Sequence, residues 1–127
     1  NAVVASDHVI IPVTAGEFAS QGLESVISAI TVIQREYNPD VSILGVLPTL
    51  FSAGRIASQN LMTYLSNLNL RTFNSKIRYC ESFRRAELAH QSVYVFDKRS
   101  NAALDMTTFS EEVLQKIKQR NHGQRTR

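Results

Sequence analysis

The chain has 127 residues, of which 43% are hydrophobic and 20% charged, and this predicts one globular domain with a modest core. No apolar run reaches the ~18 residues that a membrane-spanning helix requires, and the first residues do not resemble a signal peptide. The single cysteine, Cys80, excludes an internal disulfide and suits a reducing cytoplasm.

Charge is distributed unevenly along the chain. Residues 1–70 carry two basic and five acidic side chains, a net charge of −3, whereas residues 71–127 carry twelve basic and six acidic ones, a net charge of +6. A basic half is typical of a nucleic-acid-binding face, but it also occurs on surfaces that bind nothing. Charge alone therefore leaves both interpretations open.

The first third of the chain predicts a buried strand followed by a helix. Residues 8–13 (HVIIPV) are apolar and β-branched without the alternation of a half-exposed strand. Thr14 and Glu17 have the spacing of a capping box, which marks a helix start. The helix is expected to end at Asn38, before Pro39, and its apolar residues recur at helical spacing: Leu23, Val26, Ile27, Ile30, Ile33 and Tyr37.

The middle of the chain repeats this order. Residues 42–47 (SILGVL) predict a second buried strand, which Pro48 ends, and residues 70–73 predict a short third strand. Between them, residues 55–68 predict a helix whose apolar stripe is Ile56, Leu61, Leu65 and Leu68.

The last third predicts a short helix over residues 79–89, an extended piece at Val93–Phe96 and a longer helix over residues 101–118. Ser100 is the expected N-cap of the long helix, and its core-facing residues are Ala102, Met106, Phe109, Val113 and Ile117. Residues 1–119 are expected to form the domain, and residues 120–127 a basic, disordered tail.

Strands that alternate with helices predict an α/β fold with a parallel sheet and right-handed crossovers. About three strands are few for a sheet covered on both faces, so the sheet looks incomplete. None of the five glycines fits the phosphate-binding pattern G-x-x-x-x-G-K-[ST], and G-x-G-x-x-G and G-x-S-x-G are absent. His8, His90 and His122 have no cysteine or paired carboxylate at ligand spacing. We therefore expect no catalytic or metal-ligating residues in this chain.

Four segments, in the same order along the chain, resemble the ParA/MinD family of deviant Walker ATPases. They are NAVVASDHVIIPV (1–13), EFASQGLESVISAI (17–30), NPDVSILGVLPTLF (38–51) and the stretch from KIRYCESF to DMTTFSEEV (76–113). The resemblance implies a truncated, doubly wound sheet of the P-loop NTPase type, ParA/Soj-like, without the N-terminal half that carries the phosphate-binding loop and the catalytic switches. The chain departs from the family pattern at Phe73-Asn74, in place of Ile-Pro, and at Lys98, in place of a proline.

The resemblance also implies site residues. Pro48 and Thr49 would lie near the adenine of a bound nucleotide, and the other wall of that pocket would be Asn74, Ser75, Ile77 and Arg78. Family dimers bind DNA non-specifically through phosphate neutralisation. The candidate residues for that contact here are Arg55, Arg84, Arg85, Lys98, Arg99, Lys116, Lys118 and Arg120.

For the intact parent, the resemblance implies ATP and Mg²⁺ as cofactors, a ParB-like activator, and a bacterial cytoplasmic, nucleoid-associated location. Its function would be plasmid or chromosome partitioning through ATP-dependent dimerisation and DNA binding. For this chain alone we expect no cofactor and no hydrolysis, because the residues that hold the phosphates are absent. The free edge of the 8–13 strand predicts self-association.

Three interpretations stay open at this point. The chain is part of a partition ATPase, it is a stand-alone degenerate ParA-like binding or assembly module, or it is a small α/β enzyme of unrelated chemistry. The absence of a nucleophile–base pair and of a metal-ligand cluster in the sequence makes the last of these the weakest.

Overall fold

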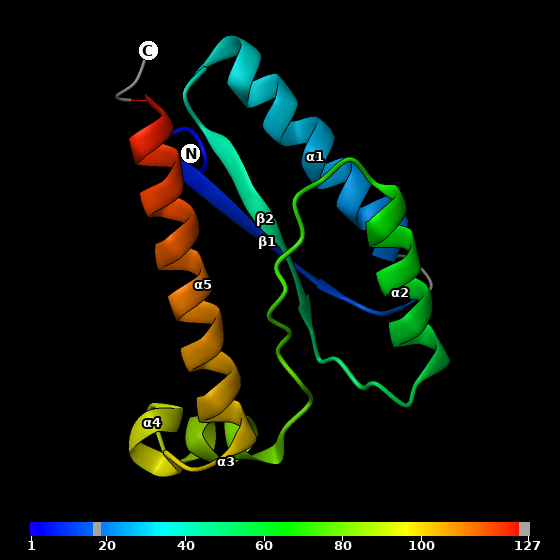
Figure 1. Ribbon diagram of the computed structural model, residues 1–127, viewed down its shortest axis with the longest axis vertical. Helices are drawn as coiled ribbons and strands as arrows, with labels where there is room; N and C mark the ends of the chain where they lie inside the picture. Colours follow the sequence, from blue (N-terminus) through cyan, green and yellow to red (C-terminus); the bar gives the residue numbers. More distant parts are fainter. Residues whose placement is uncertain (17–18, 125–127) are drawn as a thin grey trace.

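A computed structural model describes residues 1–16 and 19–124 of the chain. The elements alternate between strands and helices in the first half, and helices alone make up the second half (Figure 1). In chain order they are β1 (His8–Thr14), α1 (Ala19–Glu36), β2 (Ser42–Thr49), α2 (Ile56–Asn67), α3 (Glu81–Leu88), α4 (Val93–Phe96) and α5 (Asn101–Gln124). Within the described part of the chain, no helix combines the length and apolar character that crossing a membrane requires.

The two strands form a parallel sheet joined by α1, so the α/β fold with a parallel sheet is confirmed. The register runs from His8 opposite Ser42 to Thr14 opposite Thr49, with one irregularity after Val9. There Ile43 pairs with Val9 and Gly45 pairs with Ile10, so Leu44 is an extra residue in β2. A bulge of this kind turns the following side chains to the other face.

The expected third strand at residues 70–73 is present only as a bridge between Thr72 and Val46. Val46 N–H donates to Arg71 O at 2.8 Å, and Phe73 N–H donates to Val46 O at 2.9 Å. The next residue of β2 that faces this segment is Pro48, which has no N–H to donate. The ladder therefore ends after one residue pair.

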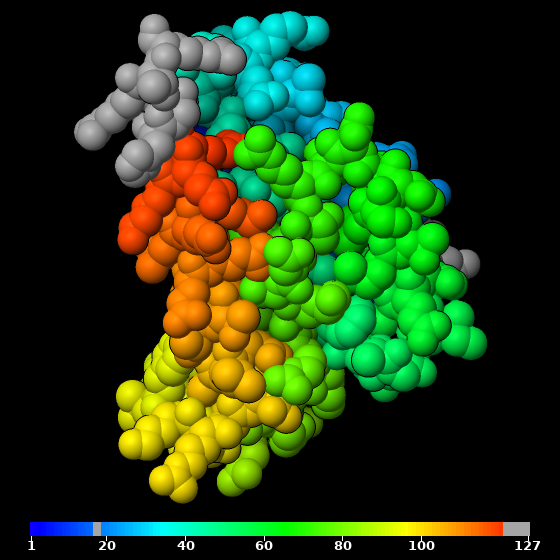
Figure 2. All heavy atoms as spheres, viewed as in Figure 1, coloured from blue at the N-terminus to red at the C-terminus, as the bar shows by residue number. Residues whose placement is uncertain are grey.

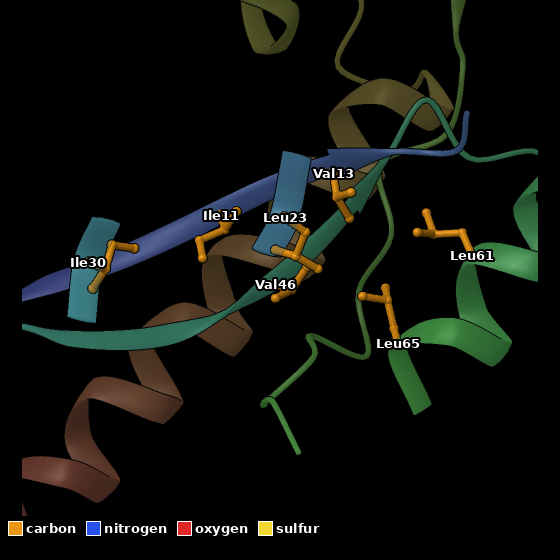
Figure 3. Close-up of a cluster of buried hydrophobic side chains, with 7 residues drawn as sticks. All are labelled: Ile11, Val13, Leu23, Ile30, Val46, Leu61 and Leu65. Carbon is orange, nitrogen blue, oxygen red and sulfur yellow. The ribbon is translucent and has the colours of Figure 1, made fainter. Parts of the chain in front are cut away.

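Helices cover both faces of this small sheet. On one face, α1 and α2 pack against the strands around Ile11, Val13, Leu23, Ile30, Val46, Leu61 and Leu65, the cluster drawn in Figure 3. On the other face, α5 packs against a second cluster of Leu44, Leu47, Phe73 and Ile77. Figure 1 shows α5 on the side of the strands opposite α1 and α2.

Phe73 fills the second cluster and is 1% exposed. Its ring meets that of Phe109 edge-on, with 5.1 Å between the ring centres. Gly45 makes this packing possible, since a Cβ there would lie 2.8 Å from Phe73 Cε2. The departure from the family pattern at position 73 thus contributes a core aromatic residue.

Most of the expected helix faces are confirmed. Leu23 and Ile30 of α1 and Leu61 and Leu65 of α2 are buried. The apolar stripe of α5 packs on the core as expected, and Ser100 Oγ accepts a hydrogen bond from Ala103 N–H, as an N-cap does. Of the expected capping box, Glu17 lies outside the described residues.

Other expectations are wrong. Ile56 is 75% exposed, because α2 begins there and its first turn extends beyond the sheet. Val26 and Tyr37 are exposed on α1. Val93–Phe96 is a helical turn rather than an extended piece, because Ser92 caps it: Ser92 Oγ accepts from Tyr94 N–H and Ser92 O from Phe96 N–H.

The last helix is longer than its apolar pattern predicts. α5 continues to Gln124, six residues past Lys118, and so enters the segment for which we expected disorder. Residues 125–127 lie outside the described part of the chain. The division into a domain of residues 1–119 and a tail stays a prediction.

Candidate functional site

The segment of residues 74–78 runs beside the end of β2 and brings together most of the expected base-binding residues. Ile77 N–H donates to Pro48 O at 2.9 Å, and Phe51 N–H donates to Ile77 O at 3.0 Å. Pro48 and Ile77 are buried in this contact. Thr49 is engaged with the neighbouring strand, because its Oγ1 lies 3.2 Å from Val13 O and 3.1 Å from Thr14 Oγ1.

Glu112 of α5 holds the start of this segment. Its two carboxylate oxygens accept hydrogen bonds from Asn74 N–H at 2.9 Å, Ser75 N–H at 2.8 Å and Ser75 Oγ at 2.6 Å. Burial alone would raise the pKa of Glu112, but these bonds and the charge of Lys116, 3.5 Å away, outweigh it and lower the pKa. The carboxylate thus replaces the strand partner that residues 74 and 75 lack.

Asp105, two helical turns before Glu112, holds the end of the same segment. It accepts Arg78 N–H at 2.9 Å and forms a two-pronged ion pair with the Arg78 guanidinium, with Nη2 at 2.7 Å. Burial opposes ionisation of Asp105, yet the hydrogen bonds and charge of Arg78 lower its pKa below the ordinary value. Arg78 therefore has a structural partner within the chain.

A hollow of about 400 Å³ opens beside this segment. Its walls combine polar groups with two apolar side chains from other elements: Phe51, Asn74, Ser75, Lys76, Arg78, Leu104, Asp105 and Thr108 line it. Lys76 Nζ lies 5.3 Å from the centre of the Phe51 ring. Three of the six expected base-site residues, Asn74, Ser75 and Arg78, line the hollow, whereas Pro48, Thr49 and Ile77 do not.

Sequence reasoning missed Asp105, Glu112, Phe51 and Leu104. A signal for the two carboxylates was present, since positions 105 and 112 are seven apart and so lie on one side of the long helix. That side is the apolar stripe, and an acidic residue in such a stripe requires a partner.

The expected DNA-binding residues do not form one patch. Arg84 and Arg85 on α3 and Lys98 and Arg99 before α5 are exposed at one end of the molecule (Figure 1). Lys116, Lys118 and Arg120 lie about 22 Å or more away along α5, at a rise of ~1.5 Å per residue. Arg55 is exposed at the start of α2.

Several of these cations have contacts within the chain, including Arg85, whose guanidinium lies 5.3 Å from the centre of the Phe96 ring. Lys116 Nζ pairs with Glu112 and lies 5.1 Å from the centre of the Phe73 ring. Arg120 donates from Nη1 to Ser42 Oγ, and from Nη2 to Ile43 O at 2.9 Å. Lys116 and Arg120 lie four residues apart on the side of α5 that faces Phe73 and the start of β2, so both side chains contribute to packing within the chain.

Parts of the chain are similar to known proteins. The family model described as an AAA domain matches residues 1–43. The sporulation initiation inhibitor protein Soj of Bacillus subtilis is 40% identical over 53 residues, which is 42% of this chain and 21% of Soj. The resemblance to ParA-type ATPases is confirmed.

Solved structures of cobyrinic acid a,c-diamide synthase from Mycobacterium smegmatis share the fold. One aligns with a TM-score of 0.56 and 22% identity over 72% of this chain and 43% of the synthase chain. Another, with a bound ATP analog and magnesium, aligns with a TM-score of 0.56 and 26% identity over 64% and 33% of the two chains. The chain thus spans less than half of each of these relatives.

Proposed function

We propose that this chain is the base-side part of a ParA-like ATPase that partitions plasmids or chromosomes. The observation that carries the proposal is the 40% identity to Soj, combined with a hollow beside residues 74–78, where the resemblance places the adenine. In this proposal, the chain supplies base, dimer and DNA contacts. The phosphates of ATP and Mg²⁺ are held by residues that this sequence does not contain, so hydrolysis belongs to the intact parent.

The lining of the hollow combines the apolar surface and the polar groups that a nucleotide base requires. Phe51 and Leu104 offer apolar surface, and Leu104 is 58% exposed. Glu112, Asp105 and Pro48 take up the N–H groups of residues 74, 75, 77 and 78. Within the described residues, the Lys76 N–H has no such partner, and Lys76 lines the hollow. In this proposal it donates to an acceptor nitrogen of the base.

Leu104→Glu is expected to weaken ATP binding by about tenfold or more in protein that carries this sequence together with its phosphate-binding part. The introduced carboxylate would occupy the hollow and repel the nucleotide. Isothermal titration measures the affinity, and hydrogen exchange locates protection at residues 48–51 and 74–78.

The matched control is Leu88→Glu, which places the same charge on an exposed leucine outside the hollow. The control should bind ATP like the unmodified protein. Equal weakening by both variants, or protection confined to other segments, would contradict the base site. DNA binding without any response to ATP would instead favour the degenerate binding module.

We also propose that the exposed cations at the α3–α4 end contact DNA. Arg84→Gln combined with Arg85→Gln should weaken binding to duplexes of unrelated sequence equally and make the salt slope shallower by about 2, because two phosphate contacts are lost. Arg35→Gln, which removes an exposed cation paired with Glu36 on α1, is the control. Binding that depends on base sequence, or a slope that the double variant leaves unchanged, would contradict non-specific phosphate contact.

Assembly and partners complete the proposal. β1 pairs with β2 along one edge, and within the described residues no strand pairs with its other edge. An unpaired edge beside apolar side chains favours addition of another strand, so we propose self-association or completion of the sheet there. A ParB-like activator is the partner proposed for the parent.

A further inference from the structure

We propose that the chain has a second ligand site, which binds a small oxyanion such as a phosphate group between Arg71 and Arg120. This inference does not rest on the proposed function. Both arginines line a hollow of about 360 Å³ together with Lys116 and Gln119. Every one of these four side chains can donate hydrogen bonds, and none of them is acidic.

The site lies at the start of strand β2, whereas the proposed base site lies at the end of that strand. Ser42, the residue that Arg120 contacts, is the first residue of β2, whereas Pro48 and Thr49 are the last two. At ~3.3 Å per residue these ends are about 20 Å apart. The oxyanion site is therefore separate from the hollow beside residues 74–78.

The sheet fixes the position of both arginines. Two N–H groups of the Arg120 guanidinium are bonded to Ser42 Oγ and Ile43 O, which leaves three donors for a ligand. Arg71 is fixed through its backbone, since its C=O accepts from Val46 N–H at 2.8 Å, while its side chain is exposed. The Arg120 guanidinium and the Arg71 backbone are thus held in place before a ligand arrives, and the exposed Arg71 side chain can turn towards it.

No carboxylate of the described residues forms an ion pair with either arginine of the site. Arg71 and Arg120 line the same hollow, and the positive charge of Arg71 adds to the effect of burial in lowering the pKa of Arg120. An anion between them would relieve their repulsion and accept bonds from both.

The neighbouring side chains limit the size of the anion. A larger hollow of about 720 Å³ adjoins the site and shares Arg71 and Arg120, but Asp7 and Asp40 also line it. A long polyanion that crossed the strand ends would meet these carboxylates. The charge pattern therefore favours a discrete phosphate group over an extended nucleic-acid backbone.

Inorganic phosphate tests the site, with chloride at matched ionic strength as the comparison. Phosphate should raise the melting temperature and titrate to one site per chain, since a ligand of the folded state stabilises it. Arg71→Gln and Arg120→Gln should each weaken phosphate binding by about tenfold. Arg71→Gln keeps the test meaningful if Arg120→Gln fails to fold, because the Arg71 side chain is exposed.

Arg35→Gln is the matched control, because Arg35 is an exposed arginine on α1 that belongs neither to this site nor to the proposed DNA-binding residues, and the variant should bind phosphate like the unmodified protein. Equal stabilisation by chloride and phosphate would overturn the proposal. So would equal phosphate affinity in all variants. Loss of duplex DNA binding in Arg71→Gln, without any phosphate binding by the unmodified protein, would also overturn it and assign Arg71 to the DNA-binding surface.

Discussion

Replacing Phe73 with alanine is expected to lower the free energy of unfolding by about 4 kcal/mol, the cost of a large cavity in a well-packed core. Phe73 is 1% exposed and packs edge-on against Phe109 of α5. It also lies where β2, the 70–78 segment and α5 meet. Figure 2 shows α5 and this segment side by side at the surface. Gly45 lets the ring approach the strand so closely that few other side chains can fill the gap.

Urea denaturation measures this loss, with Leu88→Ala as the control. Leu88 is 72% exposed, so its truncation should change stability by less than about 0.5 kcal/mol. A loss below ~1 kcal/mol for Phe73→Ala would mean that the second cluster collapses around the gap, and that Phe73 is not the centre of the packing between α5 and the sheet.

The strands and long helices could be predicted because the apolar pattern of their residues indicates which side chains are buried. Residues 8–13 and 42–47 are apolar on both faces, and the structure covers both faces with helices. The third strand could not form a ladder because of a single missing donor at Pro48, a local effect that the apolar pattern of residues 70–73 does not contain. Val93–Phe96 is equally compatible with a strand or a turn, and Ser92 decides it by capping.

The candidate site was less predictable than the fold. The family resemblance implied that Asn74, Ser75, Ile77 and Arg78 lie across a base pocket from Pro48 and Thr49, and this site stays a prediction. The structure instead brings Ile77 into direct contact with Pro48. Glu112 accepts hydrogen bonds from residues 37 and 38 positions earlier in the chain, and Asp105 from a residue 27 positions earlier. No local sequence pattern predicts which residues meet over such a separation. Charge asymmetry predicted a basic half, but the fold separates those cations between the two ends of α5.

Glu112→Ala is expected to lower the free energy of unfolding by about 2 kcal/mol at pH 7. The substitution leaves Asn74 N–H, Ser75 N–H and the Ser75 hydroxyl without their acceptor. Glu111→Ala is the control, because Glu111 is the adjacent residue on the same helix and its side chain is exposed. The control should change stability by less than about 0.5 kcal/mol. An equal loss in both variants would indicate a general effect of charge on α5 rather than a clamp on the 74–78 segment.

The pH dependence separates the carboxylate's role from packing. Because folding lowers the pKa of Glu112, its contribution is present above the unfolded value of about 4.3 and is lost as pH falls through the lower, folded value. The stability difference between the unmodified protein and Glu112→Ala should therefore narrow as the pH is lowered from 7 towards 3. Folding also lowers the pKa of Asp105, but this contribution to stability is the same in both proteins and cancels in the difference between them. A difference that stays constant over this range would mean that Glu112 stabilises the segment through contact alone, without its charge.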